Sequence, residues 1–124
     1  MAFAYWAILL AGIMPVLTVA LAKAQRGYDN NNPRDWLARQ AGWRQRADFA
    51  HRNHFEAFPF FAAAVLAALQ MHAPIDRVNL LAGIFIAARV AYTVCYLLDW
   101  ATLRSVAWFI AYGSILALFF QAAA

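Results

Sequence analysis

The chain has 124 residues, of which 65% are hydrophobic and 13% are charged, and its formal net charge is +4. A soluble domain of this length usually has about 45–50% apolar and about 25% charged residues, so the composition excludes a water-soluble globule. Only one cysteine, Cys95, is present, which excludes an intrachain disulfide.

Four apolar runs of 19 to 22 residues divide the chain, and the only Asp, Glu, Lys or Arg within them is Arg89. Each run is close to the ~20 residues that a helix needs to cross the hydrocarbon layer. Lipid leaves every backbone polar group to bond within its own segment. We therefore expect an all-α membrane protein, an antiparallel bundle of four transmembrane helices in one domain, 1–124. Its predicted spans are at about 1–22, 53–72, 78–98 and 104–123, and a long basic loop covers 23–42.

Polar breaks between the runs predict where the helices begin and end. In the first loop, Asp35 is expected to cap a short interfacial helix through Leu37. In the second break, Pro74 is expected to end one helix and Asp76 to cap the next. The third break, 99–104, reads as a tight turn. Short second and third breaks make the helices that they join antiparallel neighbours.

The basic residues are unevenly distributed, which predicts the orientation in the membrane. Arg77 is the only cation in the second break, whereas eight of the ten lie in the other two breaks or at the start of the second long helix: Lys23, Arg26, Arg34, Arg39, Arg44, Arg46, Arg52 and Arg104. We expect a multi-pass protein of a bacterial inner membrane, with the first loop cytoplasmic and both termini on the opposite side. Membrane lipids are then the expected partners, and nucleic acid is not.

Two polar stripes are predicted on the second and third long helices. At 100° per residue, the second helix, starting near Trp43, presents four side chains within about 80° of one another, Arg46, Phe49, Asn53 and Glu56. The third helix presents Arg89, Tyr92, Tyr96 and Asp99 in a similar stripe. Since polar groups inside spans are costly, we expect the two stripes to face each other or a shared cavity.

These stripes admit a structural and a functional interpretation. In the structural one, Arg89 and Glu56 neutralise each other and Asn53 bonds a neighbouring helix. We favour this role for Arg89, but a functional role for Asn53, Glu56 and the two tyrosines. His51 and His54 have metal-ligand spacing, but Glu56 points away from both on a helix, so no metal site is expected.

Residues 46–59, RADFAHRNHFEAFP, resemble the second-helix signature of the MAPEG family, the membrane-associated proteins in eicosanoid and glutathione metabolism. Residues 89–96, RVAYTVCY, resemble its third-helix signature. The similarity covers essentially the whole chain and is greatest to the small bacterial branch of the family. It implies a homotrimer that holds glutathione between adjacent subunits, in the cytoplasmic half of the membrane, and that takes a small hydrophobic co-substrate from the bilayer.

The resemblance also implies roles for individual residues. Asn53 and Glu56 would bind the polar backbone and amino group of glutathione, and Tyr92 and Tyr96 would supply hydroxyl donors. Further roles fall to three residues that carry a basic side chain: Arg46 would anchor a carboxylate or order the cytoplasmic end, His51 would reach the glutathione of the neighbouring subunit, and Arg104, as the catalytic residue, would stabilise the thiolate.

The chain departs from the family pattern at two positions of the second helix and at one near the fourth. Phe49 stands where members with a defined glutathione site have arginine, and Ala57 where they have tyrosine. Arg104 lies one residue later than the arginine of the leukotriene-synthesising members. Arg52 is a candidate to compensate for the arginine that is absent at Phe49.

The resulting hypothesis is a glutathione-dependent transferase or peroxidase that acts on lipophilic electrophiles or lipid hydroperoxides. The alternative is a non-catalytic lipid-binding or scaffold protein on the same fold, which Phe49 and Ala57 favour. A third possibility is a small proton-coupled exporter using Glu56, but the long first loop and the position of Glu56 near a helix start argue against it.

Overall fold

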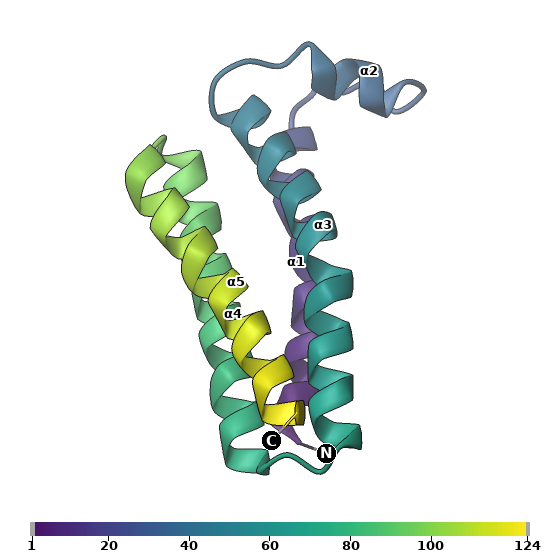
Figure 1. Cartoon of the computed structure of the whole chain (residues 1–124). Helices are drawn as coiled ribbons and strands as arrows, with labels where there is room; N and C mark the ends of the chain where they lie inside the picture. The colour runs from purple at the N-terminus through teal and green to yellow at the C-terminus, as the bar shows by residue number, and fades with distance from the viewer. Residues whose placement is uncertain (1, 124) are drawn as a thin grey trace.

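In the computed structural model, the described residues, 2–123, form five α-helices joined by turns and loops (Figure 1). Residues 1 and 124, the ends of the predicted domain, lie outside this range. Four of the helices are long and one, in the first loop, is short: α1 (Phe3–Lys23), α2 (Pro33–Ala38), α3 (Trp43–Gln70), α4 (Ile75–Leu97) and α5 (Ala101–Ala123). Helix α3 begins at the predicted Trp43 and is therefore longer than the predicted span at 53–72.

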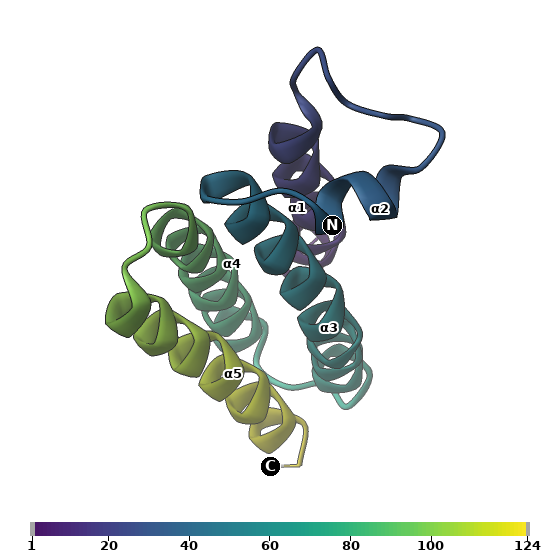
Figure 2. The ribbon, with the colours of Figure 1, turned by 90° about the horizontal axis from the view of Figure 1, so that it is seen from above.

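The long helices run up and down, so that successive ones are antiparallel. The chain ends and the α3–α4 turn lie at one end of the bundle, and α2 and the α4–α5 turn lie at the other (Figure 1). Seen from above, α3 lies between α1 on one side and the α4–α5 pair on the other (Figure 2). Helix α3 thus has neighbours on two faces, which matters for the sites described below.

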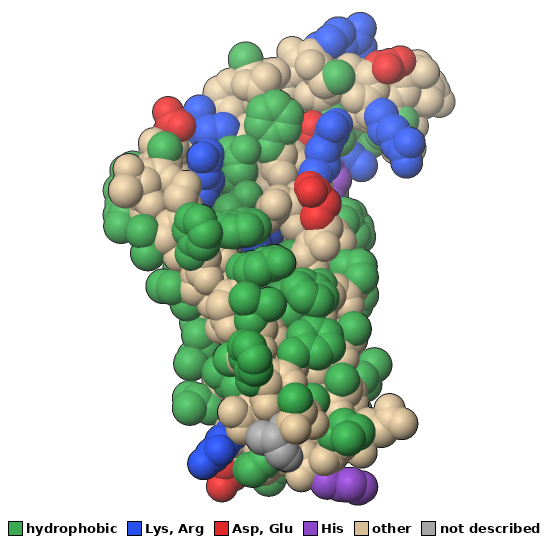
Figure 3. Space-filling model, in the orientation of Figure 1, with side chains coloured by type: hydrophobic (Ala, Val, Ile, Leu, Met, Phe, Trp, Pro, Cys, Tyr) green, Lys and Arg blue, Asp and Glu red, His purple; other side chains and the backbone are tan. Residues whose placement is uncertain are grey.

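Three helices in the described chain, α1, α4 and α5, are long and apolar enough to cross a membrane. Helix α3 is long enough, but its first half carries the polar residues between 44 and 56, which lower its hydropathy. The protein is a membrane protein with three membrane-capable helices and a fourth long helix. Most Lys and Arg side chains visible in Figure 3 lie at the α2 end.

Helix α1 packs through small residues. Its buried positions recur every three or four residues and carry no large side chain: Ala4, Ala7, Ala11, Pro15, Thr18 and Ala22. Small residues let helix backbones approach closely, which is the main source of helix association where lipid is the solvent. The four leucines and Ile13 on its other faces are exposed and available to lipid.

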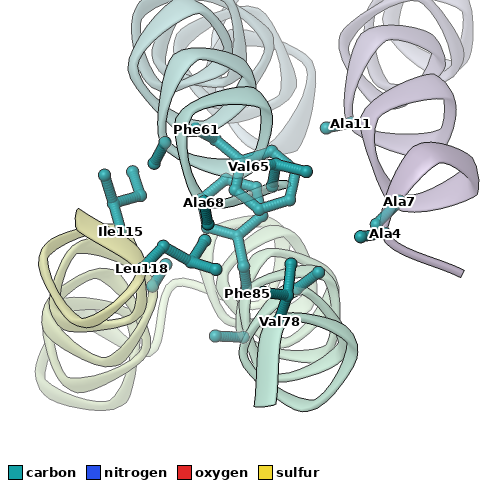
Figure 4. Packing of buried hydrophobic residues seen from close by; sticks show 14 residues of the cluster. Ala4, Ala7, Ala11, Phe61, Val65, Ala68, Val78, Phe85, Ile115 and Leu118 are labelled. Carbon is teal, nitrogen blue, oxygen red and sulfur yellow. The ribbon is translucent and has the colours of Figure 1, made fainter. Parts of the chain in front are cut away.

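The core lies between α1, α3, α4 and α5, and its residues come from the parts of these helices nearer the chain ends. Figure 4 shows how they pack. The ring of Phe61 stacks on that of Phe85, with centroids 3.8 Å apart and planes 6° from parallel. Ile115 and Leu118 of α5 close the same cluster. The backbone N–H of Ala4 donates to Oδ1 of Asn79 at 3.0 Å, which ties the first turn of α1 to α4.

The structure corrects two predicted helix caps and one predicted stripe position. Asp35 and Asp76 lie in the first turns of α2 and α4, and the N-cap positions belong to Asn32 and Pro74. A carboxylate there still favours the helix, because it faces the positive end of the helix dipole. Asp99 lies beyond the end of α4 in a left-handed conformation (φ 61°), so it does not extend the Arg89 stripe.

We predict that Phe61→Ala destabilises the bundle, because it removes the fully buried ring that stacks on Phe85. The expected loss in unfolding free energy is about 3 kcal/mol, the lower end for Phe-to-Ala, since separated helices stay in lipid. Thermal unfolding in detergent, followed by circular dichroism, measures it. Phe120→Ala is the matched control, since Phe120 is 73% exposed; equal effects of the two substitutions would contradict the prediction.

Candidate functional site

The predicted stripes of α3 and α4 meet at Arg89. Its Nη2 donates to Oδ1 of Asn53 at 2.8 Å, and its Nε donates to Nδ1 of His54 at 3.1 Å. Nη2 also lies 2.8 Å from the same His54 nitrogen. The residue is 2% exposed, and its guanidinium lies 4.3 Å from the ring centroid of Tyr92. A buried cation is therefore held by two neutral acceptors and an aromatic face.

His54 forms the back of this network. Its Nε2 lies 2.7 Å from Oγ1 of Thr93, and the Thr93 hydroxyl donates to the backbone oxygen of Arg89 at 2.9 Å. Because guanidinium N–H groups reach Nδ1, that nitrogen must accept, and the ring proton must lie on Nε2. The His54 side chain thus links two positions of α4 that lie one turn apart.

Glu56 stays outside this network. Within residues 2–123, the ion pairs shorter than 4.0 Å join Asp48 to His51 and to Arg52, and none joins Glu56 to Arg89. Of the structural interpretation, the bond from Asn53 to the neighbouring helix is therefore confirmed, whereas a direct ion pair between Glu56 and Arg89 is absent from the described residues. Glu56 and Arg89 instead line one cavity.

That cavity, the α3–α5 cavity, has a volume of about 140 Å³. Its polar wall is made by Asn53, Glu56 and Arg89. The rest of its lining is mostly apolar and comes from three helices: Ala57, Phe60, Phe85, Trp108, Ala111, Tyr112 and Ile115. A few convergent polar groups on an otherwise apolar wall are typical of a small-molecule site.

A second cavity, the Arg104 cavity, holds the two predicted tyrosines and the predicted catalytic arginine. It has a volume of about 240 Å³ and is lined by Tyr92, Tyr96, Arg104, Ser105, Trp108 and Phe109. The Arg104 guanidinium lies 4.5 Å from the ring centroid of Tyr96. Trp108 lines both this cavity and the α3–α5 cavity. The two cavities therefore adjoin along one face of α5.

Arg46 lies apart from both cavities. Its Nη2 donates to the backbone oxygen of Leu97 at 3.1 Å, at the end of α4. The last carbonyls of a helix lack partners within it, and they carry the negative end of the helix dipole. The contact ties the start of α3 to the end of α4, on the side where Tyr96 and Arg104 lie.

His51 and Arg52 lie on the other face of α3, around a buried Asp48. Asp48 is 2% exposed, and its carboxylate lies 3.2 Å from Nδ1 of His51 and 3.1 Å from Nη2 of Arg52. A third cavity, the α1–α3 cavity, has a volume of about 550 Å³; its charged and polar lining comprises Lys23, Arg34, Asp48, His51 and Arg52, and its apolar lining Val16, Val19, Pro33, Leu37 and Phe55. Arg52 therefore lines the α1–α3 cavity and not the α3–α5 cavity beside Asn53.

Of the residues singled out from the sequence, two line the α3–α5 cavity (Asn53 and Glu56) and three line the adjoining Arg104 cavity (Tyr92, Tyr96 and Arg104). The sequence analysis weighed His54 only as a metal ligand and included neither Trp108 nor Asp48 among the site residues. Asp48 had a detectable signal, because an Asp followed by a cation four residues later is a helical ion-pair spacing. Among the described residues there is no group of three or more His, Cys, Asp or Glu side chains that could hold a metal ion.

The comparisons with known proteins bear on the whole chain. The model of the MAPEG family matches residues 3–124, so the four long helices and all three cavities lie within the matched region. Searches of the curated proteins and of the solved structures gave no significant match. The match covers the α3 and α4 signatures that meet at Arg89, and this chain belongs to the MAPEG family.

Proposed function

We propose that the protein is a membrane-bound, glutathione-dependent transferase or peroxidase that acts on lipophilic electrophiles or lipid hydroperoxides. The observation that carries the proposal is the pair of adjoining cavities on one face of the bundle. One offers Asn53 and Glu56 to a charged, flexible peptide, and the other offers Tyr92, Tyr96 and Arg104 to its thiol. The basic loops attract the anionic peptide from water, and the bilayer dissolves the apolar co-substrate.

Arg104 is the proposed catalytic residue. A glutathione thiol has an ordinary pKa near 8.5, so at neutral pH most of it is the unreactive thiol. A guanidinium beside the sulfur favours the thiolate, and each unit by which the thiol pKa falls corresponds to about 1.4 kcal/mol of preferential stabilisation. Arg104 is half-buried against Tyr96, and this restricts its guanidinium to the wall of the cavity. The thiolate then attacks the electrophile, which has entered from the lipid.

The proposed active assembly is a homotrimer of four-helix protomers that span the membrane. Each of the two adjoining cavities, at about 140 and 240 Å³, is smaller than a typical ligand pocket of about 300–1,000 Å³. The α1–α3 cavity, with cationic groups and His51, lies on the opposite face of α3. In a ring of identical subunits this face meets the neighbour's Asn53 face, which encloses one glutathione per interface.

We predict that Arg104→Ala lowers kcat for glutathione conjugation by about 100-fold, the usual scale for one group that stabilises developing charge. The Kd for glutathione changes less, because the peptide portion keeps its contacts. Without the cation the bound thiol returns toward its ordinary pKa, so the rate should rise at higher pH than in the wild type. The assay uses protein in nanodiscs with an aryl halide, and calorimetry gives the Kd.

Two further variants serve as comparisons in that experiment. Arg104→Lys keeps the charge and should retain part of the rate, whereas Arg77→Ala removes a cation at the other end of the bundle and should change nothing. If the wild type fails to bind glutathione at millimolar concentration, the proposed function is wrong. An unchanged pH profile in Arg104→Ala would instead remove Arg104 from the mechanism.

The trimer proposal predicts complementation between two inactive variants. If each site combines Asn53 of one subunit with His51 of the next, Asn53→Ala and His51→Ala homotrimers are both impaired at every interface. Mixed trimers contain one interface with both native residues, so co-expression should give more activity than the mean of the separate variants. Activity that never exceeds this mean would exclude a shared site.

A non-catalytic, lipid-binding protein is the second candidate, and one observation favours it. The positions that depart from the family pattern are apolar here: Phe49 is exposed and Ala57 lines the α3–α5 cavity. Both substitutions make this face better suited to an acyl chain than to a peptide. Purified protein that carries bound phospholipid at these helices, and lacks thiol-dependent activity, would support this candidate.

A further inference from the structure

We infer that His54 is a positioning residue that acts through Arg89 and fixes the orientation of the Asn53 amide toward the ligand. The inference rests on the proposed function only in taking glutathione as the ligand. It assigns a role to a buried histidine that lines neither the α3–α5 cavity nor the Arg104 cavity. The contacts involved run in one chain from Thr93 to His54, Arg89 and Asn53.

The first link fixes the ring of His54. The side chain is buried at 3% exposure, and Nε2 is within hydrogen-bond distance of Thr93 Oγ1, whose own proton is used on the Arg89 carbonyl. The hydroxyl must therefore accept from Nε2–H, which leaves Nδ1 with its lone pair free. His54 can then offer only an acceptor to Arg89.

The second link fixes the guanidinium and, through it, the amide. Two nitrogens of Arg89, Nε and Nη2, point to His54 Nδ1, and Nη2 also reaches Oδ1 of Asn53. With its oxygen held by Arg89, the Asn53 amide has a fixed orientation and keeps its two N–H donors for the α3–α5 cavity. The polar wall then consists of donors from Arg89 and Asn53 and one acceptor, Glu56. Donors in this arrangement fit a carboxylate or carbonyl oxygen of the ligand.

The third step is that His54 prevents an ion pair between Arg89 and Glu56. Within residues 2–123 Arg89 has no carboxylate within 4.0 Å, yet Glu56 lines the same cavity. A buried guanidinium that loses its acceptor is strongly driven to find another, because an unpaired charge in lipid is costly. Without His54, the nearby acceptor is Glu56, and an Arg89–Glu56 pair would occupy both charged groups that the ligand needs.

The experiment compares His54→Leu with His54→Asn in nanodiscs. Leucine removes the acceptor, whereas Oδ1 of asparagine takes the place of Nδ1. We expect His54→Leu to raise the KM for glutathione about 10-fold or more, on the scale of a lost hydrogen bond to a charged group, with kcat changed less. His54→Asn should stay within about 3-fold of wild type. His72→Asn, at an exposed turn far from the cavity, is the control, because asparagine tolerates the left-handed backbone there (φ 57°).

A merely structural role would give a different pattern. It predicts that both His54 variants lower the thermal midpoint and lose kcat together, with no rescue of KM by asparagine. That result would overturn the inference. Asn53→Asp adds a second check, because a carboxylate still accepts from Arg89 but cannot donate to the ligand. It should keep the thermal midpoint and weaken glutathione binding about 10-fold or more.

One measurement needs no glutathione and therefore separates this inference from the proposed function. The ¹⁵N spectrum of histidine-labelled protein should show His54, assigned by its absence in His54→Asn, with Nδ1 unprotonated and Nε2 protonated. A ring proton on Nδ1, or a doubly protonated ring, overturns the inference even if the enzyme is active. If wild-type protein binds no glutathione but the spectrum is as expected, the proposed function fails and the positioning network stands.

Discussion

A guanidinium buried among membrane helices is the constraint on which the site depends. Arg89 needs acceptors from its surroundings, and they come from Asn53 and His54 on the neighbouring helix. These hydrogen bonds fix the position of α3 along α4 at the level of Arg89. Polar groups above and below this level, Glu56 toward the core and Tyr96 toward the basic loops, take their positions from that registration. The same contact that satisfies a costly charge therefore arranges the walls of two cavities.

The two faces of α3 have different partners, and this explains its mixed composition. One face meets α4 and α5 and carries Asn53 and Glu56; the other carries Asp48, His51 and Arg52 beside α1 and α2. A helix with one face against lipid carries polar groups on its other face alone. Helix α3 carries them on two faces, because each of these faces lies beside other helices. Helix α3 extends well beyond the predicted span into the basic end, and the Asp48 set lies about one turn nearer that end than Asn53 and Glu56.

Composition and periodicity were sufficient for much of the fold, because charge-free runs of about 20 residues have few alternatives to helices in lipid. They also placed Asn53, Tyr92 and Tyr96 on facing stripes, since helical angles depend only on spacing. They failed where the outcome depended on a partner in space. Whether Arg89 pairs with Glu56 or His54 is decided by side-chain reach between helices, and Asp99 left its stripe because α4 ends two residues earlier. The angular positions of residues around a single helix reveal neither the partner of Arg89 nor the end of α4.

The hydrogen bond between Ala4 and Asn79 has a consequence for how the protein is made. It joins the beginning of α1 to a residue that the ribosome reaches only after α1, α2 and α3 have been synthesised. Until then, the first helix can associate with α3 through its alanines, but its leading turn has an unsatisfied backbone donor. A residue of the second half of the chain therefore completes the anchoring of the first helix.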